Sequence, residues 1–247
     1  TSVVKEVKKK TKKVAQADPV AEIKTPKSAK IQADDEDDVL KVNWHDVPID
    51  PHADFAKLGV AQWQIDILKR VSITKPTEIQ QKCIPIILAG HDLVGRAKTG
   101  SGKTATFALP ILQNLAKDPY GIFALVLTPT RELAYQIEDQ FKVLGAPLNV
   151  ETCVVVGGLD MVRQSAVIAS RPHIVIATPG RLSDLLVRGG LEFHGEFLRY
   201  LVLDEADRLF DPCFAPFIDT ILDHIPPVGE RQTLMFSATI TSAMLKA

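Results

Sequence analysis

The distribution of apolar residues changes at about residue 44. From there to residue 247, short apolar runs rich in β-branched residues alternate with amphipathic segments of helical period. Consecutive apolar positions predict strands that are buried on both faces, and such strands require helices on both sides of the sheet. The pattern therefore predicts an α/β fold with a parallel sheet. The expected strands cover residues 92–95, 122–128, 150–156, 173–177, 200–204 and 233–236, and the expected helices cover residues 60–70, 77–89, 103–117, 131–145, 158–170, 180–189 and 213–225.

Residues 1–43 form a separate, charged segment. Residues 1–40 contain no aromatic residue and no glycine, and a lysine-rich run at residues 5–13 is followed by an acidic block at residues 34–38. Such a composition buries too little apolar surface to offset the entropy lost on ordering. We therefore expect a low-complexity, disordered tail. The lysine run also permits a nuclear address or a loose RNA tether.

Composition and charge narrow the possible function classes. The chain has 247 residues, of which 46% are hydrophobic and 24% charged, so it can bury at least one sizeable core. Its 29 Lys and Arg balance 30 Asp and Glu, so a polyanion would have to be bound by a local patch. No stretch approaches the ~18 apolar residues of a membrane helix, and we expect no membrane partner. Cys83, Cys153 and Cys213 lack metal-ligand spacing and are expected to be reduced, mostly buried thiols.

A glycine-rich segment follows the first expected strand and opens an expected helix, which is the context of a phosphate-binding loop. It reads Ala97, Lys98, Thr99, Gly100, Ser101, Gly102, Lys103 and Thr104. Gly100 and Gly102 can adopt backbone angles that turn successive N–H groups toward phosphates at the helix N-terminus. Lys103 would reach the β- and γ-phosphates, and the Thr104 hydroxyl would face Mg²⁺. The common form of this loop begins with glycine in place of Ala97. The alternative is an ordinary glycine-rich turn followed by a lysine.

An acidic block, Asp204-Glu205-Ala206-Asp207, ends the apolar strand at residues 200–204. In open parallel sheets, ligands bind at this end of the strands. Asp204 would coordinate Mg²⁺ through its waters, and Glu205 would orient or deprotonate the water that attacks the γ-phosphorus. Taken alone, two acidic residues after a strand are more often the N-cap of a helix. Together with the phosphate loop, they predict a nucleotide hydrolysis site.

Seven blocks in one order carry a family resemblance. They cover residues 76–80, 97–104, 129–134, 157–158, 178–181, 204–207 and 237–239. In this order they resemble the N-terminal RecA-like domain of a DEAD-box RNA helicase, over residues 44–247 and with Ala97 included. Residues 72–75, 127–137 and 174–177 are similar to the fungal and animal subgroup assigned to small-subunit ribosomal RNA processing. The resemblance implies a RecA-like parallel sheet with helices on both faces, as in P-loop NTPases, and RNA-dependent ATP hydrolysis coupled to RNA unwinding or RNP remodelling.

The resemblance implies ATP or ADP with Mg²⁺ as cofactors. It places the adenine site at Phe55, Ile73, Lys75, Thr77 and Gln80, with Phe55 packing behind. The Gln80 amide presents one donor and one acceptor in a plane, which match N6 and N7 of adenine. In the family a glycine and an aromatic residue usually precede this motif. Here Ser72 and Ile73 stand in those places, so adenine would rest on an aliphatic side chain.

The resemblance also implies an RNA-binding surface. It is assigned to Pro129, Thr130, Arg131, Gly157, Gly158, Thr178, Gly180 and Arg181, with Gln164 beside them. Glycine N–H groups, threonine hydroxyls and arginines bind phosphate oxygens and do not read base edges. RNA recognition is therefore expected to be independent of sequence. Taken singly, the glycine pairs in these blocks are ordinary turn signals.

The resemblance implies a link between the last block and the acidic block. Ser237 and Thr239 follow the last expected strand, and in the family they bridge to the aspartate at position 207. Two hydroxyls and a carboxylate at neighbouring strand ends can form a hydrogen-bond relay that responds to the nucleotide. The alternative is a strand end followed by a helix cap.

The family also has a second RecA-like domain, which completes the γ-phosphate site and the RNA groove. Only eight residues follow Thr239 here, and none of that domain is among them. We therefore expect this chain alone to bind Mg·ATP or Mg·ADP weakly and to have little hydrolysis or unwinding activity. The resemblance further implies a monomer in the nucleus and nucleolus, with pre-ribosomal assembly factors as partners.

Two other functions fit the phosphate loop. The chain could be an RNA-binding module that uses a nucleotide as a switch without unwinding, or another P-loop enzyme such as a small-molecule kinase. A kinase has no need for the blocks that contain Arg131 and Arg181, so the complete series favours the helicase.

Overall fold

The computed structural model describes residues 49–188, 191, 193–240 and 244. The expected tail at residues 1–43, with its lysine run, lies outside these residues. Within the described part of the chain, none of the helices combines the length and apolar character that a membrane crossing requires.

Six parallel strands form one sheet, in the order β1-β6-β5-β2-β4-β3. The strands are β1 (Leu93–Arg96), β2 (Ala124–Leu127), β3 (Thr152–Val155), β4 (Ile174–Ala177), β5 (Tyr200–Asp204) and β6 (Gln232–Ser237). Each overlaps a segment that the apolar runs predicted, although β1 ends one residue later and β6 is one residue longer at each end. The predicted parallel α/β fold is therefore confirmed.

Each of the seven expected helices is present. The helices are α1 (Gln62–Arg70), α2 (Glu78–Leu88), α3 (Lys103–Leu115), α4 (Arg131–Leu144), α5 (Met161–Ala169), α6 (Pro179–Arg188), α7 (Ala206–Leu209) and α8 (Ala215–Leu222), with 3₁₀ turns at Ala146–Leu148 and Gly195–Phe197. The sequence missed α7, because four residues are too few to show a helical period. Helix α5 begins three residues later than expected, because Asp160 caps it by accepting a hydrogen bond from the Arg163 N–H at 3.0 Å.

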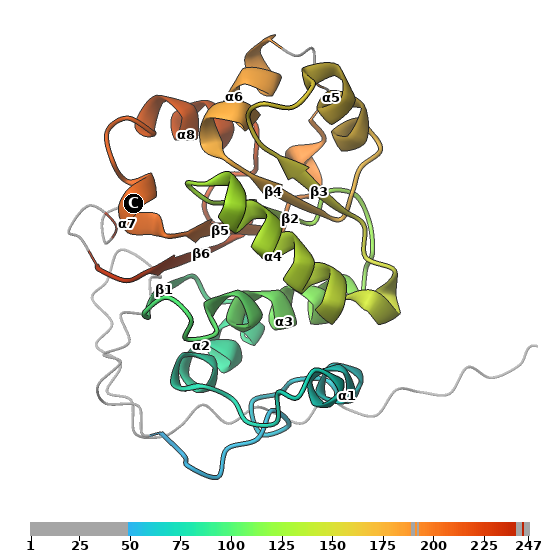
Figure 1. The fold of residues 1–247 in the computed structure, drawn as a ribbon, viewed down its shortest axis with the longest axis vertical. Coiled ribbons are helices and arrows are strands. Elements are labelled where there is room, and N and C mark those ends of the chain that lie inside the picture. Colours follow the sequence, from blue (N-terminus) through green and yellow to red (C-terminus); the bar gives the residue numbers. More distant parts are fainter. Residues whose placement is uncertain (1–48, 189–190, 192, 241–243, 245–247) are drawn as a thin grey trace, which may run out of the picture.

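Alternate strand residues face opposite sides of the sheet and belong to two separate cores. Val126 and Val202 lie in a core with residues of α1, α2, α3 and α4. Leu125 and Leu201 lie in a core with residues of α5, α6, α7 and α8. Figure 1 shows α5, α6 and α8 grouped on the side of the sheet away from α1, α2 and α3. The sheet is thus buried on both faces, as the continuous apolar runs predicted.

Candidate nucleotide site and nucleic-acid interface

All six strands run parallel, so their carboxyl ends meet at one edge of the sheet, and each strand is followed by one of the predicted blocks. Three neighbouring strands, β1, β6 and β5, lead into the phosphate loop at 97–104, the last block at 237–239 and the acidic block at 204–207, respectively. The other three neighbours, β2, β4 and β3, lead into the predicted RNA blocks at 129–134, 178–181 and 157–158, respectively. Strand order therefore gathers the phosphate-binding and acidic blocks on one half of this edge and the predicted RNA blocks on the other.

The phosphate loop has the predicted backbone. Gly100 and Gly102 have φ angles of 79° and 90°, which are left-handed conformations that favour glycine. Helix α3 begins directly afterwards, with the Lys103 side chain largely buried at 8% exposure. Lys98 and Thr99 are exposed, and Ser101 closes a turn by donating from Oγ to the Lys98 carbonyl at 2.7 Å. The N–H groups at the α3 N-terminus are therefore available to an anion.

Ala97, the departure from the common loop, belongs to the sheet. Its N–H donates to the Ser237 carbonyl at 2.9 Å, which extends the pairing of β1 with β6 by one residue. Its methyl group packs against the core that holds α1 to α4. The residue thus fixes the start of the phosphate loop against the last strand.

Gln80 connects the adenine motif to the phosphate loop. Its side chain is 3% exposed, and its Oε1 accepts the Thr77 N–H at 2.9 Å as part of a capping box at the start of α2. Its Nε2 donates to the Gly102 carbonyl at 3.2 Å. A Cβ on Gly102 would lie 2.7 Å from this Nε2, so only glycine permits the contact. The amide assigned to the adenine edge therefore also holds the phosphate loop in place.

The other residues assigned to adenine differ in how exposed their side chains are. Ile73, Lys75 and Thr77 are exposed on the segment between α1 and α2, whereas Phe55 is 3% exposed and lies in the core. Ser72, where the family usually has glycine, has a φ of 62°. It ends α1 in the left-handed position of a Schellman motif, in which the Ile73 N–H donates to the Leu68 carbonyl at 2.8 Å. The fold thus requires at this place a conformation that suits glycine.

Asp204 is buried at the end of β5, with 4% exposure. Burial raises the pKa of its carboxyl above the usual value, and the charge of Lys103 and a hydrogen bond from the Glu205 N–H only partly oppose this. The carboxylate and the Thr104 hydroxyl are hard oxygen donors of the kind that Mg²⁺ takes. No group of three or more His, Cys, Asp or Glu gathers within the described residues to hold a metal. This donor set fits an ion bound mostly through water and phosphate, as Mg²⁺ usually is.

Glu205 lies between β5 and α7 in a left-handed conformation, with a φ of 52°. Its side chain makes an ion pair with Arg208 at 2.8 Å and does not cap α7. These acidic side chains therefore do not cap a helix, which was the alternative that the sequence left open. A non-glycine residue held in this conformation is typical of functional sites.

Thr239, Ser237 and Asp207 form a hydrogen-bonded group between β5 and β6. The Thr239 hydroxyl donates to Asp207 Oδ2 at 2.7 Å, and Ser237 Oγ accepts the Asp207 N–H at 3.3 Å and the Thr239 N–H at 3.2 Å. Burial acts to raise the pKa of Asp207, but hydrogen bonds from Thr239 and Ser237 outweigh it and lower that pKa. The three side chains assigned to a relay are thus in direct contact.

Arg131 and Gly158 join two of the predicted RNA blocks. Gly158 has a φ of 80°, which favours glycine, and a Cβ there would lie 2.6 Å from Arg131 Nη1 and would displace the guanidinium. Thr130 caps α4, because its Oγ1 accepts the Leu133 N–H at 3.4 Å. The loops after β2 and β3 therefore form one surface, with the exposed Arg131 on it.

Arg181 is partly buried and is held by internal hydrogen bonds. Its Nε donates to Gln164 Oε1 at 2.9 Å and its Nη2 donates to the Leu159 carbonyl. Gln164, which is 6% exposed, in turn donates to the Val156 carbonyl at 3.0 Å. Arg181 thus fixes the loop after β3, a role that the sequence did not indicate. Thr178 directly precedes α6 and Gly180 is its second residue, and Pro129 is half-buried after β2.

Comparison with known proteins identifies the family. The model of the DEAD/DEAH box helicase family matches residues 77–247. The chain belongs to this family. It is 53% identical to "ATP-dependent RNA helicase dbp8" of Schizosaccharomyces pombe over 192 residues, which are 77% of this chain and 42% of that relative. It is also 53% identical to "Probable ATP-dependent RNA helicase DDX49" of Homo sapiens over 195 residues, which are 78% of this chain and 40% of the relative.

A solved structure supports the same assignment. A DEAD box protein from the hyperthermophile Methanococcus jannaschii matches with a TM-score of 0.71 and 34% identity, over 78% of this chain and 52% of that one. The helicase domain described here spans about two fifths of the length of the curated relatives. Membership of this family leaves no support for the alternative of a small-molecule kinase.

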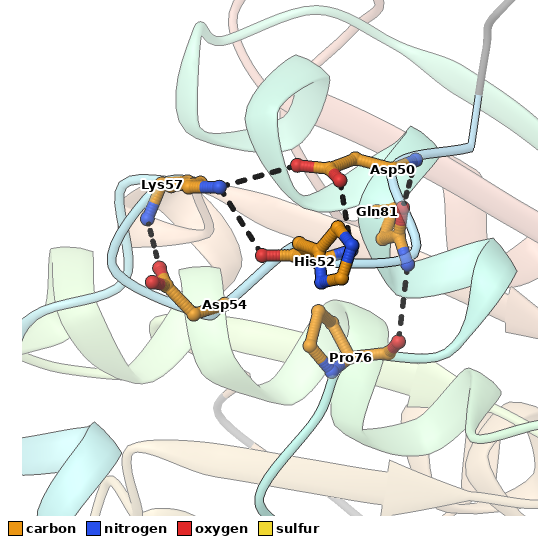
Figure 2. A network of polar contacts seen from close by, with 6 residues as sticks. All are labelled: Asp50, His52, Asp54, Lys57, Pro76 and Gln81. Carbon is orange, nitrogen blue, oxygen red and sulfur yellow. Dashed lines mark hydrogen bonds and ion pairs between the residues drawn. The ribbon is translucent and has the colours of Figure 1, made fainter.

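Two glutamines of the helicase domain were missed by the sequence analysis. Gln81 bonds both to Asp50 and to Pro76 (Figure 2), and Gln113 of α3 bonds to the N–H of Ala61 and the carbonyl of Gly59. Both hold the segment that precedes α1 against the nucleotide half of the domain. A glutamine on a helix carries no sequence signal for this role, because exposed helix positions often hold glutamine.

Proposed function

We propose that this DEAD/DEAH box helicase domain binds Mg·ATP at the carboxyl ends of β1, β5 and β6 and an RNA backbone at the ends of β2, β3 and β4. In the whole protein, ATP hydrolysis would drive RNA duplex unwinding or RNP remodelling. The observation that carries the proposal is the strand order, which places the two groups of blocks side by side on one sheet edge.

The residues of the phosphate half have distinct tasks. The N–H groups after Gly100 and the Lys103 ammonium bind the β- and γ-phosphates. Thr104 and Asp204 hold Mg²⁺, mostly through water, and the ion when bound neutralises charge that develops on the phosphate oxygens. Glu205 orients the attacking water and accepts its proton. The Glu205 carboxylate also makes an ion pair with Arg208 at 2.8 Å.

Adenine selection belongs to the segment between α1 and α2. Gln80 reads the base edge, with Ile73, Lys75 and Thr77 around it and Phe55 behind. Because Gln80 also bonds to the Gly102 carbonyl at 3.2 Å, binding of the base acts on the backbone that binds the phosphates. This contact supports a site in which base and phosphate recognition depend on each other.

The RNA half binds the sugar–phosphate backbone. Thr130, Arg131 and Gly158 meet on the surface described above, and Arg181 holds the adjoining loop through Gln164. Backbone contacts of this kind are independent of sequence. The group formed by Asp207, Ser237 and Thr239 links the acidic block to the end of β6, so a change at the γ-phosphate would be passed to it.

We further propose that the whole protein acts in small-subunit ribosomal RNA processing, as a monomer in the nucleus and nucleolus, with pre-ribosomal assembly factors as partners. The resemblance of residues 72–75, 127–137 and 174–177 to that subgroup supports this. The relatives' printed names supply only the activity, ATP-dependent RNA helicase.

The test is phosphate release with and without RNA, by a protein that carries this chain together with a second RecA-like domain. Lys103→Ala and Glu205→Gln are each expected to abolish the RNA-stimulated release. Glu205→Gln keeps its affinity for ATP, because only the proton acceptor is lost, whereas Lys103→Ala loses a phosphate contact and binds ATP weakly. Nucleotide binding without phosphate release, with every RNA tried, contradicts the helicase proposal and supports the nucleotide-switched module.

A further inference from the structure

A loop at residues 50–57 is closed by its own polar contacts before it reaches α1 (Figure 2). Asp50 accepts the His52 N–H at 2.8 Å and the Lys57 ammonium at 3.2 Å. Lys57 also donates from Nζ to the His52 carbonyl at 3.1 Å and from its N–H to Asp54 at 2.8 Å. These contacts give the loop a defined shape that does not depend on α2.

Gln81 of α2 is the side chain that fastens this loop to the segment between α1 and α2. Its Oε1 accepts the Asp50 N–H at 3.2 Å, and its Nε2 donates to the Pro76 carbonyl at 3.3 Å. Figure 2 shows the amide between the two backbones, with one end directed at each. Asp50 and Gln81 are 31 positions apart in the chain, so this contact joins two segments that are distant in sequence. Figure 2 shows the same amide bonded to both of them.

Both segments carry residues assigned to adenine. The loop at residues 50–57 carries the buried Phe55, and the segment at residues 73–77 carries Ile73, Lys75 and Thr77. The second segment is held at both ends. At its start the Ile73 N–H donates to the Leu68 carbonyl of α1, and at its end the Thr77 N–H donates to Gln80 Oε1. Between these points, Gln81 holds Pro76.

We propose that Gln81 is a positioning residue for adenine recognition, which holds the two base-binding segments at the spacing that Gln80 requires. The inference rests on the proposed ATP site. Loss of the amide leaves the Asp50 N–H and the Pro76 carbonyl without this partner, so both segments can shift away from the base. The phosphate loop keeps two anchors, the bond from Ala97 to Ser237 at 2.9 Å and the bond from Gln80 to Gly102 at 3.2 Å. Gln81 makes neither of them, so its loss is expected to act on base recognition and to leave phosphate binding in place.

The experiment measures the affinity of this chain for Mg·ADP, Mg·GDP and Mg·pyrophosphate by titration calorimetry. In Gln81→Ala, the Kd for ADP rises about tenfold, the lower end of the loss seen when a group that orients a metal ligand is removed, while the Kd for pyrophosphate stays unchanged. The preference for ADP over GDP falls accordingly. Gln81→Glu keeps the acceptor for Asp50 but loses the donor to Pro76, so its loss is smaller. Gln136→Ala, at an exposed glutamine of α4, is the matched control and changes neither affinity.

A second variant tests the inference in case Gln81→Ala does not fold. Lys57→Met opens the loop at residues 50–57 without touching α2, and it shifts the preference for ADP over GDP in the same direction by a smaller factor. The inference alone is overturned if the wild-type chain prefers ADP while Gln81→Ala keeps that preference, or if Gln81→Ala weakens ADP and pyrophosphate equally. A wild-type chain without a preference for ADP over GDP overturns the proposed adenine site and this inference with it.

Discussion

Ser72 shows how a single backbone angle affects stability. At a φ of 62° it occupies the left-handed position that ends α1, where a side chain is strained and glycine is not. Ser72→Gly is therefore expected to raise the free energy of unfolding by about 1 kcal/mol, as measured by urea denaturation.

The control for this prediction is Ser170→Gly. Ser170 ends α5 with a φ of −73°, so glycine gains nothing there and adds entropy to the unfolded chain. It is expected to lower stability slightly. A Ser72→Gly protein that is no more stable than wild type would show that the left-handed angle carries no cost.

The three thiols differ in reactivity, because the thiolate is the reactive form. Burial raises the pKa of Cys153 to about 11 and also raises the pKa of the buried Cys83, which leaves almost no thiolate at pH 8. Cys213 is exposed, and its pKa is raised chiefly by a hydrogen bond to Asp211. In the native protein a thiol reagent should therefore modify Cys213 alone.

Asp211→Asn removes the group that holds the Cys213 pKa up, so it should increase the labelling rate severalfold at pH 8. In denaturant all three thiols should react at similar rates in both proteins. Native labelling of two or three thiols at a comparable rate is the result that contradicts this assignment.

At the scale of elements, the start of α5 depends on one carboxylate. The pKa of Asp160 is lowered chiefly by a hydrogen bond from the Arg163 N–H. Burial opposes this, and the Val162 N–H and the charges of Arg163 and Arg181 lower the pKa further. A carboxyl whose pKa is lower in the folded state stabilises the fold above its unfolded pKa, and this contribution is lost as the pH falls through the folded value.

We therefore expect amide hydrogen exchange in the first turn of α5 to accelerate as the pH falls below the usual aspartate range, after correction for the intrinsic rates. Asp160→Ala should show the faster exchange already at neutral pH, and it should show little further change in acid. Because α5 also carries Gln164, the loop that Arg181 holds should loosen together with the helix. Exchange in the variant that matches wild type at neutral pH would exclude the cap.

At the scale of the whole molecule, the strand order predicts that the two halves of the sheet edge can be impaired separately. Arg131→Ala should weaken binding of polyuridylate by this chain and reduce the slope of log affinity against log salt by about 0.7, the value for one phosphate contact on a single strand. Its affinity for Mg·ADP should not change. Fluorescence anisotropy at several salt concentrations measures both the affinity and the slope.

Lys103→Ala is expected to do the reverse, with loss of Mg·ADP binding and little change in RNA affinity. Arg188→Ala is a suitable charge control, because Arg188 lies at the far end of α6 with a side chain that is 78% exposed. An equal loss of RNA affinity in the Arg131 and Arg188 variants would mean that only net charge matters and that the surface is not a site.

The elements predicted from the sequence match the structure most closely where burial decides the conformation. Strands β2, β4 and β5 are apolar at nearly every position because both faces are covered, so the pattern alone located them. The four residues of α7 are too short to leave such a pattern. The start of α5 was missed for a related reason, since a cap is set by one side chain and not by a period.

The sequence by itself determined which residue types follow each strand, and with them the phosphate loop, the acidic block and the family. These features are local, because a glycine that allows a left-handed backbone or a carboxylate at a strand end has its meaning within a few residues. Strand order is not local. Only the tertiary structure placed β1, β6 and β5 on one half of the sheet and β2, β4 and β3 on the other.

The same reason explains the side-chain contacts. Three hydrogen bonds join residues that are far apart in the chain: 22 positions for Gln80 and Gly102, 17 for Arg181 and Gln164, and 31 for Gln81 and Asp50. Each depends on how the helices pack against the sheet, and no spacing in the sequence encodes that packing. The sequence thus determined the chemistry of this helicase domain, and the tertiary structure decided which of its residues hold that chemistry in position.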